Sequence, residues 1–133
     1  AVMPAMADQV NDTDLHVSTT RYNHSDSIVF SINLKKGNLQ QQYEDARFIL
    51  MQTVDEKTVE DVINYARQAS VRDDNNRLPP IKTFYSLNKM AVRIAGGDVS
   101  VTIQVWHTEI PAFAGKLYDS TGALDDALQN YSG

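Results

Sequence analysis

Two short segments carry side chains that could do chemistry, and the first is a histidine and glutamate pair. His107 and Glu109 lie two residues apart at the end of a predicted strand, so both side chains would emerge on one face if the strand continues. Such a pair can bind a metal ion or share a proton, with His16 or His24 as a third group. An H-x-E pair lacks the ligand spacing that makes a zinc motif specific. We therefore expect an ordinary strand end, with no metal site and no cofactor.

The second segment, residues 22–26, combines a phenol, an imidazole, a hydroxyl and a carboxylate. A hydrolase triad of Ser25, His24 and Asp26 needs convergent side chains, whereas adjacent side chains on a tight turn diverge. These residue types favour turns because they hydrogen-bond their own backbone. The sequence therefore predicts a turn over residues 23–26 rather than a catalytic site.

The most suggestive binding feature is the last predicted strand, residues 99–107, in which apolar residues alternate with Ser100, Thr102, Gln104 and Trp106. We expect the apolar face to be core and the second face to be largely solvated. Tryptophan and tyrosine anchor interfaces through a large rigid apolar area with one polar group. The candidate binding residues are Thr102, Gln104, Trp106, Phe113 and Tyr118. The alternative is that a C-terminal helix covers Trp106, which would make these residues a satellite of the core.

Two other functional classes stay open. A small-ligand-binding domain would use a pocket between the sheet and the helices, and its candidate lining residues are Phe48, Phe84, Tyr85 and Trp106. A small hydrolase or metal enzyme would use His107 and Glu109 together with His24 or His16.

Composition excludes several classes of protein. The chain has 133 residues, 12 basic against 17 acidic side chains, a net charge of -5 and no cysteine. This length suits one domain with its own core, and no apolar run reaches the roughly 18 residues of a membrane span. The absence of cysteine excludes disulfides and thiolate metal sites, and the lack of clustered lysine and arginine disfavours nucleic acid as a partner.

The first residues favour export. Ala5-Met6-Ala7 matches the A-x-A pattern that precedes a signal-peptidase cut. We therefore interpret residues 1–7 as the remainder of a signal peptide, residues 8–14 as a flexible lead-in and residues 15–133 as a single domain. The expected location is periplasmic or secreted.

Hydrophobic periodicity then predicts the elements that must position these residues. Strands are expected over residues 15–22, 27–34, 81–87, 90–95 and 99–107. Helical spacing runs from a cap at Asn38 to Ser70, with capping patterns that begin at Thr53 and Thr58, and it predicts two helices broken near residues 54–57 or one kinked helix. Residues 72–80 read as a surface connection, and a short C-terminal helix ends the chain. The order ββ-αα-βββ-α predicts an α+β fold, with an antiparallel sheet of about five strands and helices packed on one face.

These observations favour an exported, non-enzymatic binding protein that acts on a protein partner, as an inhibitor, an immunity protein or an envelope accessory factor. No dense catalytic constellation is present, and aromatic loop residues suit recognition better than turnover. A homodimer is among the assemblies left open. The strands are mildly basic, which is compatible with an acidic partner facing the sheet; the residues responsible are Arg21, Lys35, Lys36, Lys82, Lys89 and Arg93.

Overall fold

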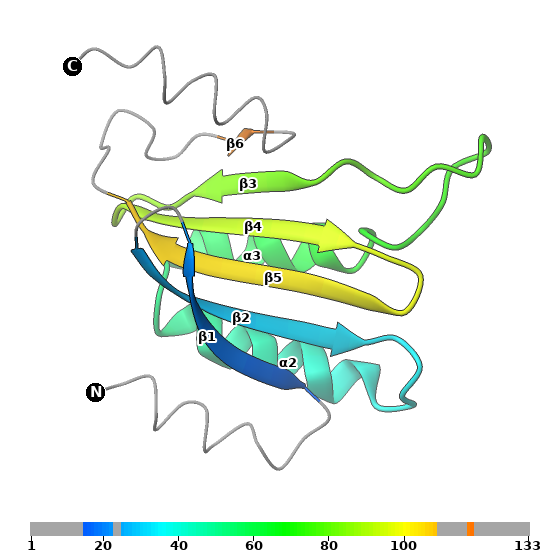
Figure 1. Ribbon diagram of the computed structural model, residues 1–133, viewed down its shortest axis with the longest axis horizontal. Helices are drawn as coiled ribbons and strands as arrows, with labels where there is room; N and C mark the ends of the chain where they lie inside the picture. Colours follow the sequence, from blue (N-terminus) through cyan, green and yellow to red (C-terminus); the bar gives the residue numbers. More distant parts are fainter. Residues whose placement is uncertain (1–14, 23–24, 109–116, 119–133) are drawn as a thin grey trace.

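The computed structural model describes residues 15–22, 25–108 and 117–118 (Figure 1). The strands are β1 (His16–Tyr22), β2 (Ser25–Asn33), β3 (Lys82–Tyr85), β4 (Met90–Gly96), β5 (Ser100–His107) and β6 (Leu117–Tyr118), and the helices are α2 (Leu39–Met51) and α3 (Glu56–Ala66). The expectations for residues 1–14 and for a C-terminal helix lie outside the described residues.

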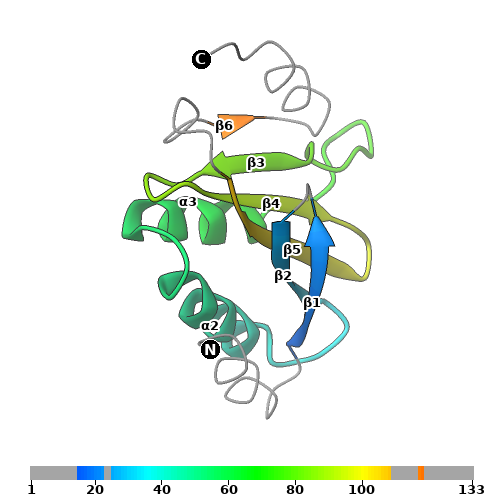
Figure 2. The same cartoon turned by 60° about the vertical axis from the view of Figure 1, so that its left-hand side comes forward.

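The strands form one sheet in the order β1-β2-β5-β4-β3-β6, and every pairing among them is antiparallel. Both helices lie against the same face of this sheet, α2 over β2 and α3 over β4 and β3 (Figures 1 and 2). The predicted α+β class, the antiparallel sheet and the order ββ-αα-βββ are therefore confirmed. None of the described helices is long and apolar enough to cross a membrane.

The core lies between the sheet and the helices, and the pairing of β2 with β5 forms its centre. The apolar side chains of β2 face those of β5 across the register, as the pairs Ile28 with Val105, Phe30 with Ile103 and Ile32 with Val101. Period-two alternation puts all of these side chains on the face that the helices cover. The helices contribute a stripe at three- and four-residue spacing, and its fully buried members include Ala46, Leu50, Val59 and Val62.

A buried glutamine joins α2 to the end of β2. The side chain of Gln42 is fully buried, its Oε1 accepts from the backbone N–H of Asn33 at 2.6 Å, and its Nε2 donates to the Asn33 carbonyl at 3.0 Å. Asn33 lies opposite Ser100 on the β5 side, but on the β1 side the last pair joins His16 to Ser31, so no described strand residue faces Asn33 there. The amide of Gln42 therefore takes the place of a neighbouring strand.

We predict that Gln42→Leu lowers the free energy of unfolding by about 2 kcal/mol or more, because it leaves two backbone groups of Asn33 without a partner. Urea unfolding measures the change. Gln41→Leu is the control, because Gln41 is exposed on the same helix and its loss should cost no more than about 0.5 kcal/mol. Equal losses for the two variants would contradict this role of Gln42.

The two helices are separate, which is one of the two predicted arrangements, and the break falls at residues 52–55, two residues before the predicted 54–57. The N-cap of α3 is Asp55, whose carboxylate accepts from the Thr58 N–H at 3.1 Å. The predicted caps at Thr53 and Thr58 are wrong, because the hydroxyl of Thr53 donates instead to the carbonyls of the last turn of α2, and Thr58 lies inside α3. The carboxylate of Asp55 caps α3, and its negative charge interacts favourably with the positive N-terminal end of the helix dipole.

The end of β4 passes directly under the residues that follow α3. A Cβ atom added at Gly96 would lie 1.8 Å from the carbonyl oxygen of Ala69. No real contact is that short, so the backbone of β4 and the segment after α3 approach each other only because residue 96 has no side chain.

Gly96→Ala should therefore destabilise the fold by about 2 kcal/mol or more, because the backbone around Ala69 must shift. Thermal unfolding followed by circular dichroism checks this. Gly37→Ala is the matched control, since a Cβ there meets nothing within 4 Å. An unchanged midpoint for Gly96→Ala would refute the close approach.

The first hairpin is tighter than the sequence suggests. The register pairs Tyr22 with Ser25, so only residues 23 and 24 connect the two strands. The predicted four-residue turn is wrong because Ser25 and Asp26 belong to β2. Asp26 pairs with Arg21 across the strands, and their side chains form an exposed ion pair at 3.4 Å. That opposite-charge pair favours extension of the ladder toward the turn.

Candidate functional site

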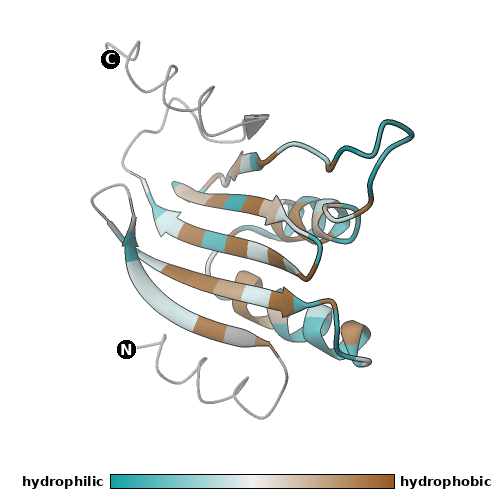
Figure 3. Ribbon diagram, turned by 45° about the vertical axis from the view of Figure 1, so that its right-hand side comes forward, coloured by the Kyte–Doolittle hydropathy of each residue, from teal (hydrophilic) through white to brown (hydrophobic). Residues whose placement is uncertain are grey.

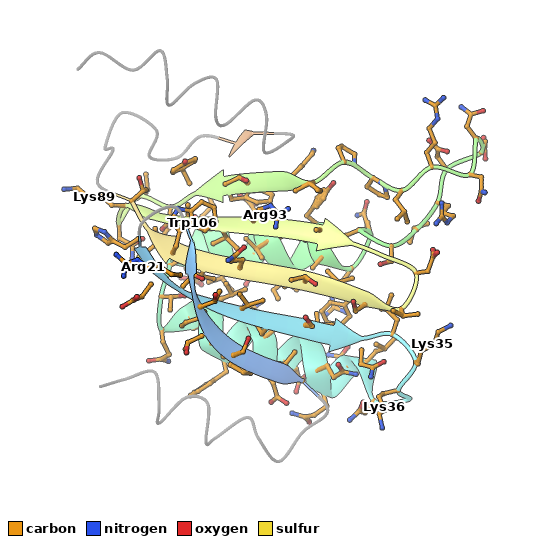
Figure 4. All side chains as sticks on the ribbon, in the orientation of Figure 1. Arg21, Lys35, Lys36, Lys89, Arg93 and Trp106 are labelled. Atoms are coloured by element: carbon orange, nitrogen blue, oxygen red, sulfur yellow. The ribbon has the colours of Figure 1, made fainter. Side chains whose placement is uncertain are left out.

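The face of the sheet that the helices leave uncovered is here called the open face. Strand alternation and the register assign its members, and Figure 4 shows the sheet from this side. On β1 to β5, the members whose side chains the structure describes are Ser18, Thr20, Ser27, Val29, Ser31, Asn33, Ser100, Thr102, Gln104, Trp106, Ala91, Arg93, Ala95, Thr83 and Tyr85.

One end of the open face is buried. Trp106 lies between Ser27 and Ala91 in the register, and Tyr85 follows Ala91. The exposed fractions are 1% for Trp106 and 3% for Tyr85, although α2 and α3 lie on the opposite face. The expectation that this face is largely solvated is therefore wrong for Trp106, and also for Gln104 at 8%. Alternation specifies which face a side chain takes, but it does not specify what covers that face.

Hydrogen bonds satisfy the buried polar side chains of the open face, Gln104 and Ser27. Gln104 Nε2 bonds to the Ser27 hydroxyl at 3.2 Å, and Ser27 Oγ donates to the Thr20 carbonyl at 3.2 Å. This chain of bonds links β5, β2 and β1 across the sheet. Gln104 thus has a structural partner, as buried amides require.

Four accessible hydroxyl side chains of the open face are here called the hydroxyl strip: Ser18, Thr20, Ser31 and Thr102. Ser18 and Thr20 are exposed on β1, while Ser31 and Thr102 are half-buried on β2 and β5. The hydroxyls of Ser31 and Thr102 are 3.5 Å apart. Three adjacent strands therefore contribute small polar side chains to the open face, with the half-buried Val29 opposite Ser18 and with Thr20 four register positions from Ser31.

Charge on the open face has one sign. Arg93 is the only charged residue among its described members, and it lies opposite Thr83 in the register. Thr83 is fully buried, and its Oγ1 has no hydrogen-bond partner among the residues that the structure describes. Figure 4 shows Arg93 beside Trp106, with Lys89 and Arg21 toward the same end of the sheet. Lys35 and Lys36 lie at the opposite end (Figure 4).

The predicted binding residues are only partly brought together. Thr102, Gln104 and Trp106 share the open face of β5. The backbone of Tyr118 joins the sheet in β6, and β4 and β3 lie between β6 and β5. This separation is roughly 14 Å at the usual strand spacing. Phe113 lies outside the described residues, and the role of all five in binding stays a prediction.

The predicted histidine site is not assembled by the part of the chain that is described. His107 is exposed at the end of β5. The register aligns His16 with Ser31 and Thr102, five positions along the strands from His107. That separation is about 17 Å along the strands, too far for one metal ion. Glu109 and His24 lie outside the described residues. Among the described residues, no group of three or more histidine, aspartate or glutamate side chains could hold a metal ion.

The predicted ligand pocket is also not formed by the four expected side chains. Phe48 and Phe84 pack against the core between the sheet and the helices. Tyr85 and Trp106 lie on the open face, on the other side of the sheet. Phe84 and Tyr85 are consecutive residues of one strand, so they point to opposite faces. The expected lining is therefore wrong for Tyr85 and Trp106.

A polar cluster that the sequence did not reveal joins the two helices to the turn between β3 and β4. Asp55 accepts a hydrogen bond from the hydroxyl of Ser86 and another from the backbone N–H of Leu87 at 2.9 Å. Partial burial of Asp55 opposes its ionisation, but the bonds from Ser86, Leu87 and Thr58 outweigh it and lower the pKa of Asp55 to about 2. So acidic a carboxylate is a poor base for activating the Ser86 hydroxyl, and the cluster is structural.

Asp55 should make stability depend on pH in the acid range. Its pKa in the folded chain lies near 2, below the ordinary 3.8, so its contribution is present above about pH 4 and is lost as the pH falls toward 2. We predict that the loss of stability between about pH 5 and pH 2.5, measured by urea unfolding, is smaller in Asp55→Asn. Asp74→Asn, at an exposed loop position, is the control and should leave the loss unchanged. Equal losses in Asp55→Asn and the parent would contradict the assignment.

Comparison of the chain with models of protein families, with curated proteins and with solved structures gives no match. Sequence reasoning missed Ser31 as the residue opposite Thr102, and it did not place Ser18 and Arg93 on the same face. The alternation in residues 27–33 is sufficient to place Ser31 on the polar face of its strand. Only the register shows that Ser31 lies beside Thr102.

Proposed function

We propose that this chain is a small, exported, non-enzymatic binding protein and that a protein partner docks on its open face. The observation that supports the proposal is the hydroxyl strip, whose four small side chains come from β1, β2 and β5 and lie on the face opposite α2 and α3. Small-molecule sites are usually concave, whereas small side chains spread over several strands suit contact with a macromolecule. Small hydroxyl side chains can accept and donate hydrogen bonds without requiring a pocket.

The partner surface is acidic in this proposal. Arg93 supplies the charge of the open face, and no acidic residue lies on that face among the described strands. Complementary charge would orient the partner and exclude basic competitors. An inhibitor, an immunity protein and an envelope accessory factor would all use a surface of this kind. Export rests on the Ala5-Met6-Ala7 pattern alone.

We predict that Thr102→Glu weakens partner binding by about tenfold or more, because it adds a bulky negative charge to the hydroxyl strip on β5, beside Ser31. The measurement is affinity capture with the immobilised chain, from an extract of source cells that includes the envelope fraction, followed by titration of the captured partner. Asn64→Glu is the matched control, since Asn64 is exposed on α3, in the helix layer.

Two results would contradict the proposal. One is the absence of any stoichiometric partner from extracts in which the parent chain is folded. The other is equal affinity of the parent and of Thr102→Glu, which would place the contact elsewhere on the molecule.

A further inference from the structure

The outer edge of β1 is a second surface at which this chain could bind a partner. β1 is the first strand of the sheet and pairs with β2 alone among the described strands (Figure 3). Ser18, Thr19, Thr20 and Arg21 are all exposed, on both faces of the strand. Neither helix covers these four side chains.

The direction of the backbone groups along β1 follows from one hydrogen bond. Leu34 donates to the carbonyl of Val99 at 3.0 Å, so the even-numbered residues of β2 bond toward β5 and the odd-numbered residues face β1. The odd residues of β2 are paired with even residues of β1. The N–H and C=O groups of Val17 and Thr19 therefore point outward, and they make no hydrogen bond to the described residues.

Within its own residues, β1 lacks the proline, lysine and bulge that commonly block strand addition. Exposed edges are usually interrupted by proline, lysine or a bulge, because an open ladder pairs with other strands. β1 contains no proline and no lysine, and its seven pairs with β2 follow without a gap. Among the described residues, the edge of β1 is therefore open to another strand.

We propose that β1 pairs with β1 of a second copy of this chain, antiparallel and about a two-fold axis at Thr19, so that two sheets become one. In this register Thr19 faces Thr19 of the partner subunit, and Ser18 faces the partner's Thr20. Val17 faces the partner's Arg21. Pairs of threonine and serine are favourable across strands, and a two-fold interface needs such self-complementarity.

Charge does not oppose this arrangement. Arg21 is the only charged residue of β1 apart from the titratable His16, and it forms an ion pair with Asp26 of its own chain. The two Arg21 residues of the dimer would lie about 14 Å apart along the strands, beyond the screening length at physiological salt. The dimer would also place two hydroxyl strips on one continuous open face.

Sedimentation velocity on the full chain over a range of about 1 to 200 µM tests the proposal, because strand addition alone gives modest affinity. We expect a concentration-dependent monomer–dimer equilibrium in the parent. Thr19→Pro removes the outward N–H and leaves the internal ladder intact, so it should raise the dissociation constant by about tenfold or more. Thr19→Ala keeps the N–H and is the control, with a change of less than about threefold.

A cross-linking arm tests the register and does not depend on whether Thr19→Pro folds. The chain has no cysteine, so Thr19→Cys would carry a single thiol. The two Cα atoms at position 19 would lie about 5.5 Å apart, within disulfide range. At position 18 they would lie about 8 Å apart, out of range. Mild oxidation should therefore cross-link Thr19→Cys in the dimer much faster than Ser18→Cys.

Three results would overturn the proposal. A parent chain that stays monomeric over the whole concentration range would do so. A dimer that a folded Thr19→Pro leaves at the same dissociation constant would place the contact away from β1. Equal cross-linking at positions 18 and 19 would contradict the two-fold register. The same result is expected if a strand other than β1 of the second copy pairs with this edge.

Discussion

The pairing of β2 with β5 is the contact on which the rest of this structure depends. It joins residues near position 30 to residues near position 103, so it brings the two ends of the described domain together. Both helices lie between these strands in the sequence, and they must return the chain across one face of the sheet. Long-range antiparallel pairing of this kind carries a loop-closure cost that local contacts do not, and here the burial of Phe30 and Ile103 offsets it.

The same pairing determines what each face can do. The apolar residues of β2 and β5 line up on the helix side, and polar residues line up on the open face. The open face is then divided along its length: the end at Trp106 is buried, and the part at Ser31 and Thr102 is accessible in part. The accessible part lies next to β1, so the proposed docking surface and the proposed pairing edge are adjacent on one side of the sheet.

Much of the fold could be predicted from the sequence, because hydrophobic period reports local structure directly. The alternation in β2 and β5 and the helical stripe from Leu39 onward were sufficient for the class and the element order. The exact caps were not predictable, since Asp55 competes with two nearby threonines and its advantage comes from Ser86 and Leu87, more than thirty residues away. The sequence likewise does not predict that Gln42 hydrogen-bonds to the backbone of Asn33.

The candidate site was harder to predict than the fold. The sequence indicates that Thr102, Gln104 and Trp106 share a face, but burial depends on neighbours that only the register supplies. Gln104 and Ser27 are buried, although strand alternation predicts that they face solvent. The hydrogen bonds of Gln104 to Ser27 and of Ser27 to Thr20 satisfy their polar groups. The proposed docking surface is therefore the hydroxyl strip rather than the aromatic end of β5.

The most direct test of this account is acrylamide quenching of tryptophan fluorescence, because Trp106 is the only tryptophan in the chain. A Trp106 side chain that is 1% exposed should show an emission maximum shifted to shorter wavelength than in the urea-unfolded chain, together with a quenching constant several-fold lower. Quenching equal to that of the unfolded chain would show that Trp106 is accessible, and it would return the aromatic end of β5 to the binding surface.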